Sequence, residues 1–208
     1  MYAILRKFSL TFISLSLLLI SNSYAEGLDM ENTLYLQLKD GKVVIQMLPD
    51  VAPKHVARIK ELVRAKFYDG IVFHRVIEDF MAQAGDPTGT GAGGSDKGNI
   101  PAEFSTISHK RGIVSMARRG NDVNSANSQF FIVLADSTFL DGQYTVWGKV
   151  VEGMEFVDKI KLGEGSSGMV ANPDKIVSIV VAADVAKKEE PKAKKAPTNS
   201  KKPVKSNT

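Results

Sequence analysis

The chain has 208 residues, 43% of them hydrophobic and 24% charged, so it has enough apolar material for one globular core. It contains no cysteine, which excludes disulfides, catalytic thiols, thiolate metal sites and a lipid-modified cysteine anchor. The formal charge of +4 is concentrated at the two ends, because residues 1–25 are basic and residues 187–208 hold eight lysines and two glutamates. The body between the ends is therefore mildly acidic.

The first 25 residues have the organisation of a secretory signal peptide. Arg6 and Lys7 give a charged start, residues 8–20 an apolar run, and Ser23-Tyr24-Ala25 a small-x-small cleavage site. A membrane anchor is the alternative, but a span needs about 20 apolar residues, and hydroxyl side chains interrupt this shorter run. We expect cleavage after Ala25, a mature chain that does not span a membrane, and location in the periplasm, with secretion as the second choice.

The body begins with a predicted β-hairpin followed by an amphipathic helix. Residues 33–38 and 42–47 are strand-like, and Asp40-Gly41 between them is a strong hairpin turn. Pro53 suits the first turn of a helix, after which Val56, Ile59 and Val63 recur at helical spacing. This pattern predicts a helix that covers one end of the sheet.

A polar pair then frames an apolar floor. Arg75 and Gln83 stand eight residues apart, with Phe80 and Met81 between them. If residues 73–76 are extended, alternation places Phe73 and Arg75 on one face. The structural alternative for the arginine is a stem that lies over apolar surface with its charged head in water.

Residues 89–94 formally satisfy the dinucleotide-binding pattern G-x-G-x-x-G. That pattern requires a helix beginning at the glycines within a βαβ unit, whereas residues 95–101 continue as a loop. We therefore expect no nucleotide or other cofactor, and interpret the segment as a mobile rim beside a binding groove.

The remaining body is rich in short strands. Residues 113–117, 128–134, 144–150 and 176–181 are strand-like, residues 118–127 form a polar loop that could wall a groove, and residues 154–161 read as a short helix. Many short strands with two helices predict a mainly β fold, a closed β-barrel capped at both ends.

The last 22 residues, 187–208, contain almost no large apolar side chain, so we expect a disordered tail that follows a domain at 26–186. The tail is either a solubilising extension or an electrostatic contact for an anionic surface. Specific nucleic-acid binding ranks last, because no aromatic residue is interleaved with the lysines.

Several motifs in register resemble those of the cyclophilin family of peptidyl-prolyl cis-trans isomerases, in the bacterial exported form. They are Phe73-His74-Arg75, Phe80-Met81-x-Gln83, Ser115-Met116-Ala117, Ser128-Gln129-Phe130-Phe131 and Leu140-Asp141-Gly142. The resemblance runs from about residue 33 to 184 and implies a closed antiparallel eight-stranded β-barrel capped by two α-helices. It also implies an enzyme that accelerates rotation about X-Pro bonds and assists folding of exported proteins. The alternative is a proline-binding module or chaperone without significant turnover.

The resemblance assigns roles to particular residues. It implies Arg75, Phe80 and Gln83 as catalytic residues acting on proline-containing polypeptides, without metal or cofactor. Substrate contacts are implied for Met81, Ala117, Arg118, Gln129, Phe131, Phe139, Leu140 and Tyr144.

Some positions depart from the family pattern best known in eukaryotes. Arg118 stands where many relatives have Asn, while Phe139 and Tyr144 replace a Trp and a His at the pocket rim. Since cyclosporin binding depends on that Trp, we expect weak cyclosporin binding. A monomer is expected. The three histidines are too scattered in sequence to indicate a metal site or a catalytic triad, and His74 is interpreted as a structural hydrogen-bonding residue.

Overall fold

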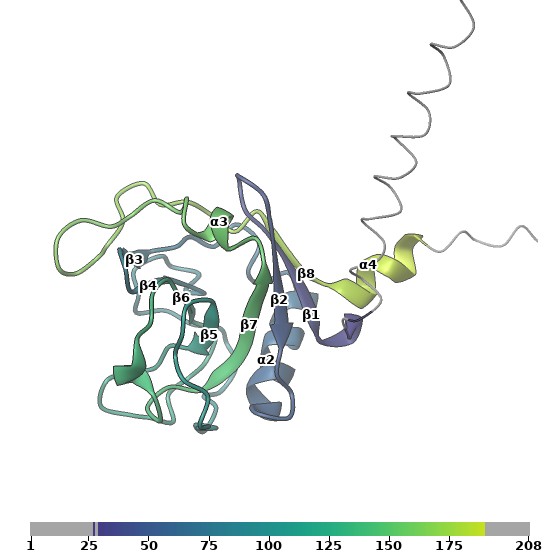
Figure 1. Cartoon of the computed structure of the whole chain (residues 1–208), viewed down its shortest axis with the longest axis horizontal. Helices are drawn as coiled ribbons and strands as arrows, with labels where there is room; N and C mark the ends of the chain where they lie inside the picture. The colour runs from purple at the N-terminus through teal and green to yellow at the C-terminus, as the bar shows by residue number, and fades with distance from the viewer. Residues whose placement is uncertain (1–26, 28, 190–208) are drawn as a thin grey trace, which may run out of the picture.

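The computed structural model describes residue 27 and residues 29–189 (Figure 1). The predicted signal peptide, and the predicted tail beyond residue 189, lie outside the described residues. Eight strands form one antiparallel sheet in the order β3-β4-β6-β5-β7-β2-β1-β8. The strands are β1 (Thr33–Gln37), β2 (Lys42–Met47), β3 (Arg75–Ile77), β4 (Met81–Ala84), β5 (Ile113–Met116), β6 (Phe130–Val133), β7 (Val146–Glu152) and β8 (Ser178–Val181).

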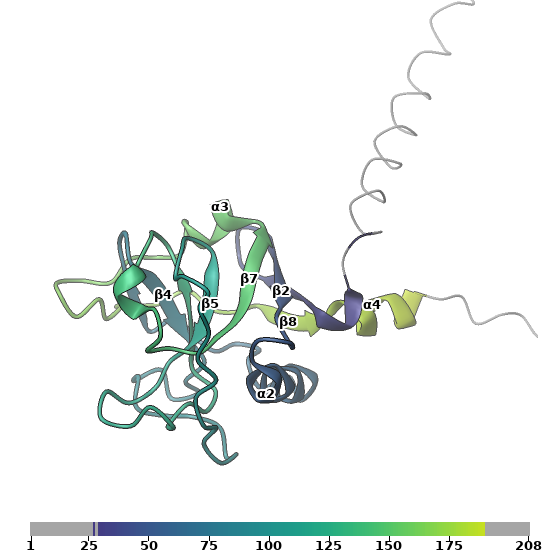
Figure 2. The same ribbon diagram turned by 60° about the horizontal axis from the view of Figure 1, so that its bottom comes forward.

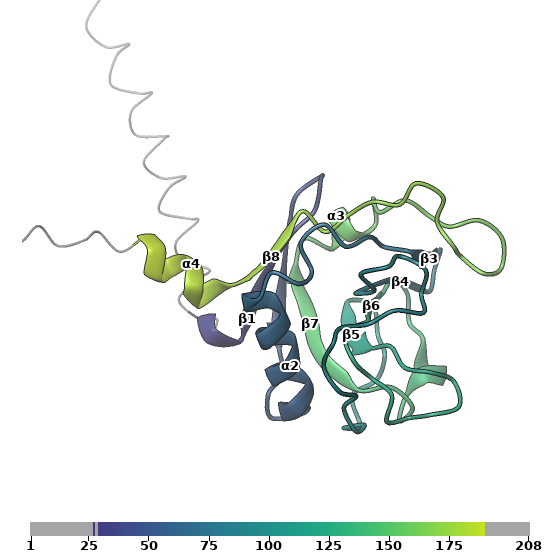
Figure 3. The same cartoon turned by 180° about the vertical axis from the view of Figure 1, so that it is seen from behind.

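The predicted hairpin and helix are both confirmed. Strands β1 and β2 pair from Thr33 opposite Gln46 to Gln37 opposite Lys42, around the Asp40-Gly41 turn. Helix α2 (Pro53–Arg64) begins at the predicted proline and buries the predicted apolar face against β8 and the sheet core. Figures 1 and 3 show α2 lying along β1 and β2 from two opposite sides.

The sheet is strongly curled but is not the closed barrel that the sequence predicted (Figure 2). β3 and β8 are its two edges and do not pair with each other. Irregular segments bridge the gap instead: Val72 pairs with Lys175 in an isolated bridge, and Phe73 donates its N–H to the carbonyl of Asp174 at 2.9 Å. The outer edge of β3 is likewise paired with irregular chain, because Val76 exchanges backbone hydrogen bonds with Gly163 and Gly168 instead of with a strand.

The helices differ from the prediction at the C-terminal side. Helix α3 (Met154–Val157) is shorter than the predicted 154–161. An unpredicted helix, α4 (Ala182–Glu189), packs against β1 and the 3-10 turn η2 (Met30–Asn32), as Figure 1 shows. It crosses the expected domain boundary at 186. Arg64 of α2 joins the two ends of the domain by bonding Glu31 and Asp184, each at 3.0 Å.

The sheet separates two apolar clusters. The larger lies between the sheet and α2 and includes Trp147, Phe73 and Phe130. The smaller, on the opposite face, contains Met81, Ile113, Phe131, Val133, Leu140 and Val146. The expected shared face of Phe73 and Arg75 is wrong: β3 begins only at Arg75, and Phe73 packs in the larger core whereas Arg75 lines the pocket beside the smaller cluster.

Candidate functional site

Strands β3 and β4 bring the predicted polar pair together. Arg75 lies directly opposite Gln83, and Ile77 opposite Met81, so these side chains share the face that carries the smaller cluster. A tight turn with Asp79 at a φ of 53° directs Phe80 into the same place. A pocket of about 120 Å³ results. It is lined by Arg75, Phe80, Met81, Gln83, Ala117, Arg118, Phe131, Leu140 and Tyr144.

All eleven residues predicted for the site gather here. Nine line the small pocket, and the other two stand at its margins. Gln129 accepts a hydrogen bond from Nε2 of Gln83 at 2.8 Å, and the Phe139 ring lies 5.4 Å from the Phe80 ring. Phe139 is 65% exposed, which places it on the rim rather than in the floor.

The Arg75 guanidinium is held at the pocket instead of extending into water. Its Nε donates to the carbonyl oxygen of Ser167 at 2.9 Å, while Nη1 lies 3.4 Å from Oε1 of Gln83 and 3.9 Å from Sδ of Met81. Nη2 makes no hydrogen bond within residues 29–189. The arrangement leaves donors of a fixed cation over an apolar floor and argues against the structural alternative of a solvated stem.

Aromatic rings build the apolar wall of this pocket. Phe131 is buried and meets Tyr144 edge-on, at 5.5 Å and 85°. The guanidinium carbon of Arg118 lies 4.6 Å above the Tyr144 ring, a cation–π contact that fixes the opposite rim. The wall is therefore apolar where Phe131 and Tyr144 meet, and it carries a positive charge where Arg118 covers the Tyr144 ring.

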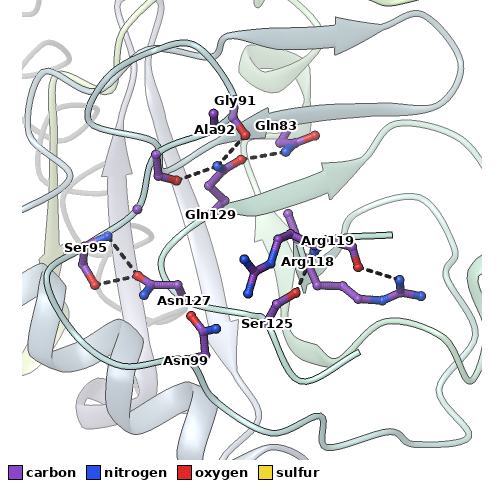
Figure 4. A pocket seen from close by; sticks show the side chains of 13 residues that line it. Gln83, Gly91, Ala92, Ser95, Asn99, Arg118, Arg119, Ser125, Asn127 and Gln129 are labelled. Carbon is purple, nitrogen blue, oxygen red and sulfur yellow. Dashed lines mark hydrogen bonds between the residues drawn. The ribbon is translucent and has the colours of Figure 1, made fainter. Parts of the chain in front are cut away.

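A second, larger pocket of about 570 Å³ adjoins the first and shares Gln83, Ala117 and Arg118 with it. Figure 4 shows the amides of Gln83 and Gln129 meeting at this larger pocket. Both walls predicted from sequence are present, the Gly-rich segment and the polar loop after β5. The residues lining the pocket are Gln83, Gly91, Ala92, Gly93, Gly94, Ser95, Asn99, Ala117, Arg118, Arg119, Ser125, Asn127 and Gln129.

Asp86, which the sequence did not single out, organises the Gly-rich rim. Its buried carboxylate accepts backbone N–H groups of Thr88, Thr90, Gly91 and Gly93 at 2.6 to 3.1 Å. Burial alone would raise the pKa of Asp86, but the hydrogen bonds from Thr88, Gly93 and Gly91 outweigh it and lower the pKa to about 2. The Gly-rich segment is thus a loop folded around the Asp86 carboxylate. This agrees with the prediction that the segment is a loop and not the start of a dinucleotide-binding helix.

Three hydrogen-bonded side chains, Ser115, His109 and Asp141, lie beneath the pocket, and no sequence motif indicates them. His109 Nδ1 lies 2.9 Å from Asp141 Oδ1, and its Nε2 lies 3.0 Å from Ser115 Oγ. Hydrogen bonds from the His109 N–H and the Ser108 hydroxyl lower the pKa of Asp141 to about 2, so Asp141 is the acceptor. Ser115 is completely buried, hence no substrate carbonyl can reach its hydroxyl. These three side chains support the pocket from below, since the His109 ring stacks on the Phe131 ring with 6.3 Å between the ring centroids.

His74 does not have the predicted hydrogen-bonding role. It is 1% exposed, and neither ring nitrogen has a hydrogen-bond partner in the part of the chain that the structure describes. Burial, the largest effect, lowers the pKa of His74 and favours the neutral ring. Its neighbours pack against the ring instead of bonding it, and a Cβ placed on Gly91 would stand 3.5 Å from its Nε2.

Within the described ranges, no group of three or more His, Asp or Glu side chains is arranged to hold a metal ion. The same residues include no helix with the length and apolarity to cross a bilayer.

The fold is thus a curled antiparallel sheet that presents a small apolar pocket beneath a fixed guanidinium, next to an open polar pocket. Residues 33–181 match the family described as cyclophilin type peptidyl-prolyl cis-trans isomerase/CLD, and the chain belongs to this family of isomerases.

Relatives and solved structures agree with this assignment. A probable peptidyl-prolyl cis-trans isomerase of Brucella suis is 51% identical over 185 residues, covering 83% of this chain and 93% of the relative. One from Schizosaccharomyces pombe is 41% identical over 150 residues, covering 70% and 96%. The crystal structure of cyclophilin AquaCyp293 from Hirschia baltica has a TM-score of 0.68 at 29% identity, covering 76% of each chain. A Cryptosporidium parvum cyclophilin type isomerase, crystallised in the presence of the dipeptide Ala-Pro, has a TM-score of 0.67 at 28% identity, covering 72% of this chain and 98% of that one.

Proposed function

We propose that this isomerase acts on exported polypeptides, with Arg75 as the central catalytic residue and the small pocket as the proline site. The observation that carries the proposal is the position of Arg75, whose free donors stand over the apolar floor formed by Met81, Phe131 and Leu140. The proposal adds residue roles and a cellular setting to the isomerase activity.

The chemistry of X-Pro rotation needs no nucleophile. The amide is planar through resonance, and the barrier to rotation is about 20 kcal/mol. As the bond twists, the proline nitrogen loses resonance and becomes an amine-like acceptor with a lone pair. A fixed, permanently charged donor stabilises that state more than the planar one, which lowers the barrier.

The geometry suits this task on both sides of the bond. Phe80, Met81, Phe131 and Leu140 would hold the proline ring still, while Gln83 would donate to a substrate carbonyl. Nη2 of Arg75 has no partner among the described residues and would approach the proline nitrogen. The backbones of Ala117 and Arg118, together with the Gln129 amide, would bind the residues that precede proline along the second pocket.

Turnover is tested by exchange spectroscopy on a short Ala-Pro peptide. We expect the cis and trans signals of the peptide to broaden by exchange when catalytic amounts of protein are added. A peptide that shifts or loses mobility without cis-trans exchange would show a binding module instead.

The exported setting rests on the first 25 residues, which lie outside the described structure. We propose that the mature chain begins at Glu26, resides in the periplasm and is a monomer. Intact-mass measurement of protein from the cell-envelope fraction checks the start, and light scattering checks the monomer. Retention of residues 1–25 in a detergent-soluble fraction would contradict export with cleavage.

A further inference from the structure

The loop of residues 163–169, which follows α3, runs along the outer edge of β3 (Figures 1 and 3). Gly163 donates its N–H to the carbonyl of Val76 at 2.9 Å, and Val76 donates to the carbonyl of Gly168 at 2.8 Å. An isolated bridge pairs Met169 with Arg75 itself. The loop therefore acts as a partial ninth strand against the three residues that carry the arginine.

The same loop supplies the shortest hydrogen bond that Arg75 makes. The carbonyl oxygen of Ser167 accepts Nε at 2.9 Å, compared with 3.4 Å from Nη1 to the Gln83 oxygen. A backbone carbonyl in a paired loop cannot rotate away as a side chain can. Because Nε–H is held by this carbonyl, the guanidinium plane cannot rotate freely, and the terminal Nη1 and Nη2 groups stay directed at the pocket.

Two glycines permit the loop to close tightly enough to present this carbonyl. A Cβ on Gly163 would stand 1.9 Å from the carbonyl oxygen of Gly168. A Cβ on Gly168, whose φ is 68°, would stand 2.3 Å from Cγ1 of Ile77. Neither contact is possible for a real side chain, so the crossing of the loop over itself and over β3 requires both glycines.

We propose that residues 163–169 form a positioning loop for catalysis, in which the Gly163–Gly168 crossing places the Ser167 carbonyl so that it orients Arg75. The inference rests on the proposed role of Arg75 and adds a group outside both pockets to the machinery of the reaction. The acceptor is a main-chain atom of an exposed serine, which explains why no side-chain motif indicates it.

The test disrupts the Gly163–Gly168 crossing by substitution and leaves Arg75 in place. Gly163→Ala forces the loop apart and is expected to lower kcat/KM about tenfold or more, with peptide Kd changed by less than about threefold. Ser166→Ala is the matched control, because it removes an exposed side chain of the same loop and leaves the Gly163–Gly168 crossing intact, so kcat/KM should stay within about twofold. Normal turnover in Gly163→Ala, or an equal loss in Ser166→Ala, would overturn the inference.

A double-mutant cycle separates positioning from general damage. Adding Gly163→Ala to Arg75→Ala should cause little further loss, since the loop acts through a side chain that is already absent. Additive losses would show that the loop contributes independently of Arg75. If Arg75→Ala alone turns over normally, the proposed catalytic role of Arg75 is wrong. If Arg75→Ala is slow but Gly163→Ala turns over normally, only the role of the loop is contradicted.

A measurement on the unsubstituted protein keeps the inference testable if Gly163→Ala does not fold. The Nε–H proton of Arg75, assigned by its loss in Arg75→Lys, should exchange with solvent more slowly than those of exposed arginines such as Arg119. It should remain slow in Ser167→Ala. Rapid exchange in the unsubstituted protein would show that Ser167 does not hold the guanidinium.

Discussion

Gln83 donates a hydrogen bond from Nε2 to Oε1 of Gln129 at 2.8 Å, and this contact joins the two pockets of the site. Oε1 of Gln83 faces the Arg75 cation, while Nε2 of Gln129 donates onward to the carbonyls of Gly91 and Gly93. Donors and acceptors thus alternate from the arginine to the Gly-rich rim. Each amide has its orientation set by its neighbours, so the site is ordered before substrate arrives.

Removing the Gln129 side chain should break this series of hydrogen bonds without destroying the pocket. Gln129→Ala leaves Gln83 without its partner and two rim carbonyls without their donor, at about 0.5 to 1.5 kcal/mol for each hydrogen bond lost. We expect kcat/KM to fall about threefold to tenfold, chiefly through KM. Asn99→Ala is the control, because Asn99 lines the same pocket without a hydrogen bond to the described residues. Equal effects of the two substitutions would contradict the ordering role of Gln129.

Asp86 should make stability depend on pH in acid. Its folded pKa of about 2 lies below the unfolded value of about 3.9, so ionisation favours the folded state. The contribution, about 2 to 3 kcal/mol, is complete above about pH 4 and is lost as pH falls through about 2. Asp86→Asn lacks it at every pH. The difference in urea unfolding free energy between the two proteins should therefore be largest near pH 6 and shrink towards pH 2.5. A difference that stays constant over this range would show that Asp86 is not the titrating group.

Gly153, which precedes α3, should be intolerant of a side chain. Its φ is 84°, and a Cβ would stand 2.4 Å from the carbonyl oxygen of Lys42 in the β1–β2 hairpin. Gly153→Ala should cost about 1 to 3 kcal/mol in unfolding free energy from backbone conformation alone, with the clash adding to it. Gly98→Ala, which meets nothing within 4 Å, serves as the control and should be nearly neutral. Similar melting temperatures for both variants would refute the argument.

Cyclosporin should inhibit weakly, because Phe139 offers the exposed rim an aromatic face but no N–H donor. Phe139→Trp supplies an indole N–H worth about 0.5 to 1.5 kcal/mol, before any gain in contact area. We expect cyclosporin affinity to rise about tenfold or more, while peptide turnover changes less. Tight inhibition of the unsubstituted protein would show that Phe139 is not the relevant rim position.

Most strands, the hairpin turn and the start of α2 could be predicted from sequence because their signals are local. Alternation, Asp40-Gly41 and Pro53 act within a few residues. Closure of the sheet could not be predicted in the same way. It depends on whether β3 pairs with β8 or with the loop of residues 163–169, and both of these segments lie far from β3 in the sequence.

The residues of the site show the same difference between local signals and contacts formed by distant segments. Arg75, Gln83 and the aromatic floor have motif signals, whereas the groups that hold them are backbone atoms or distant polar residues. The Ser167 carbonyl has no side-chain signature, and His109 meets Asp141, 32 residues further along the chain, only in the folded protein. The scattered positions of the histidines in sequence therefore concealed a hydrogen-bonded chain that the fold assembles.

The most direct test of the account is kcat/KM and peptide Kd for Arg75→Ala and Arg75→Lys, measured with melting temperatures. Loss of a preorganised donor costs about 2.7 to 4 kcal/mol in the transition state. Arg75→Ala should therefore lower kcat/KM by about 10² to 10³ with a much smaller change in Kd. Arg75→Lys should recover only part of the rate, because it keeps the charge but loses the planar group that Ser167 and Gln83 orient. Near-normal turnover by a folded Arg75→Ala would contradict the central claim and leave the pocket as a proline-binding surface without this catalytic residue.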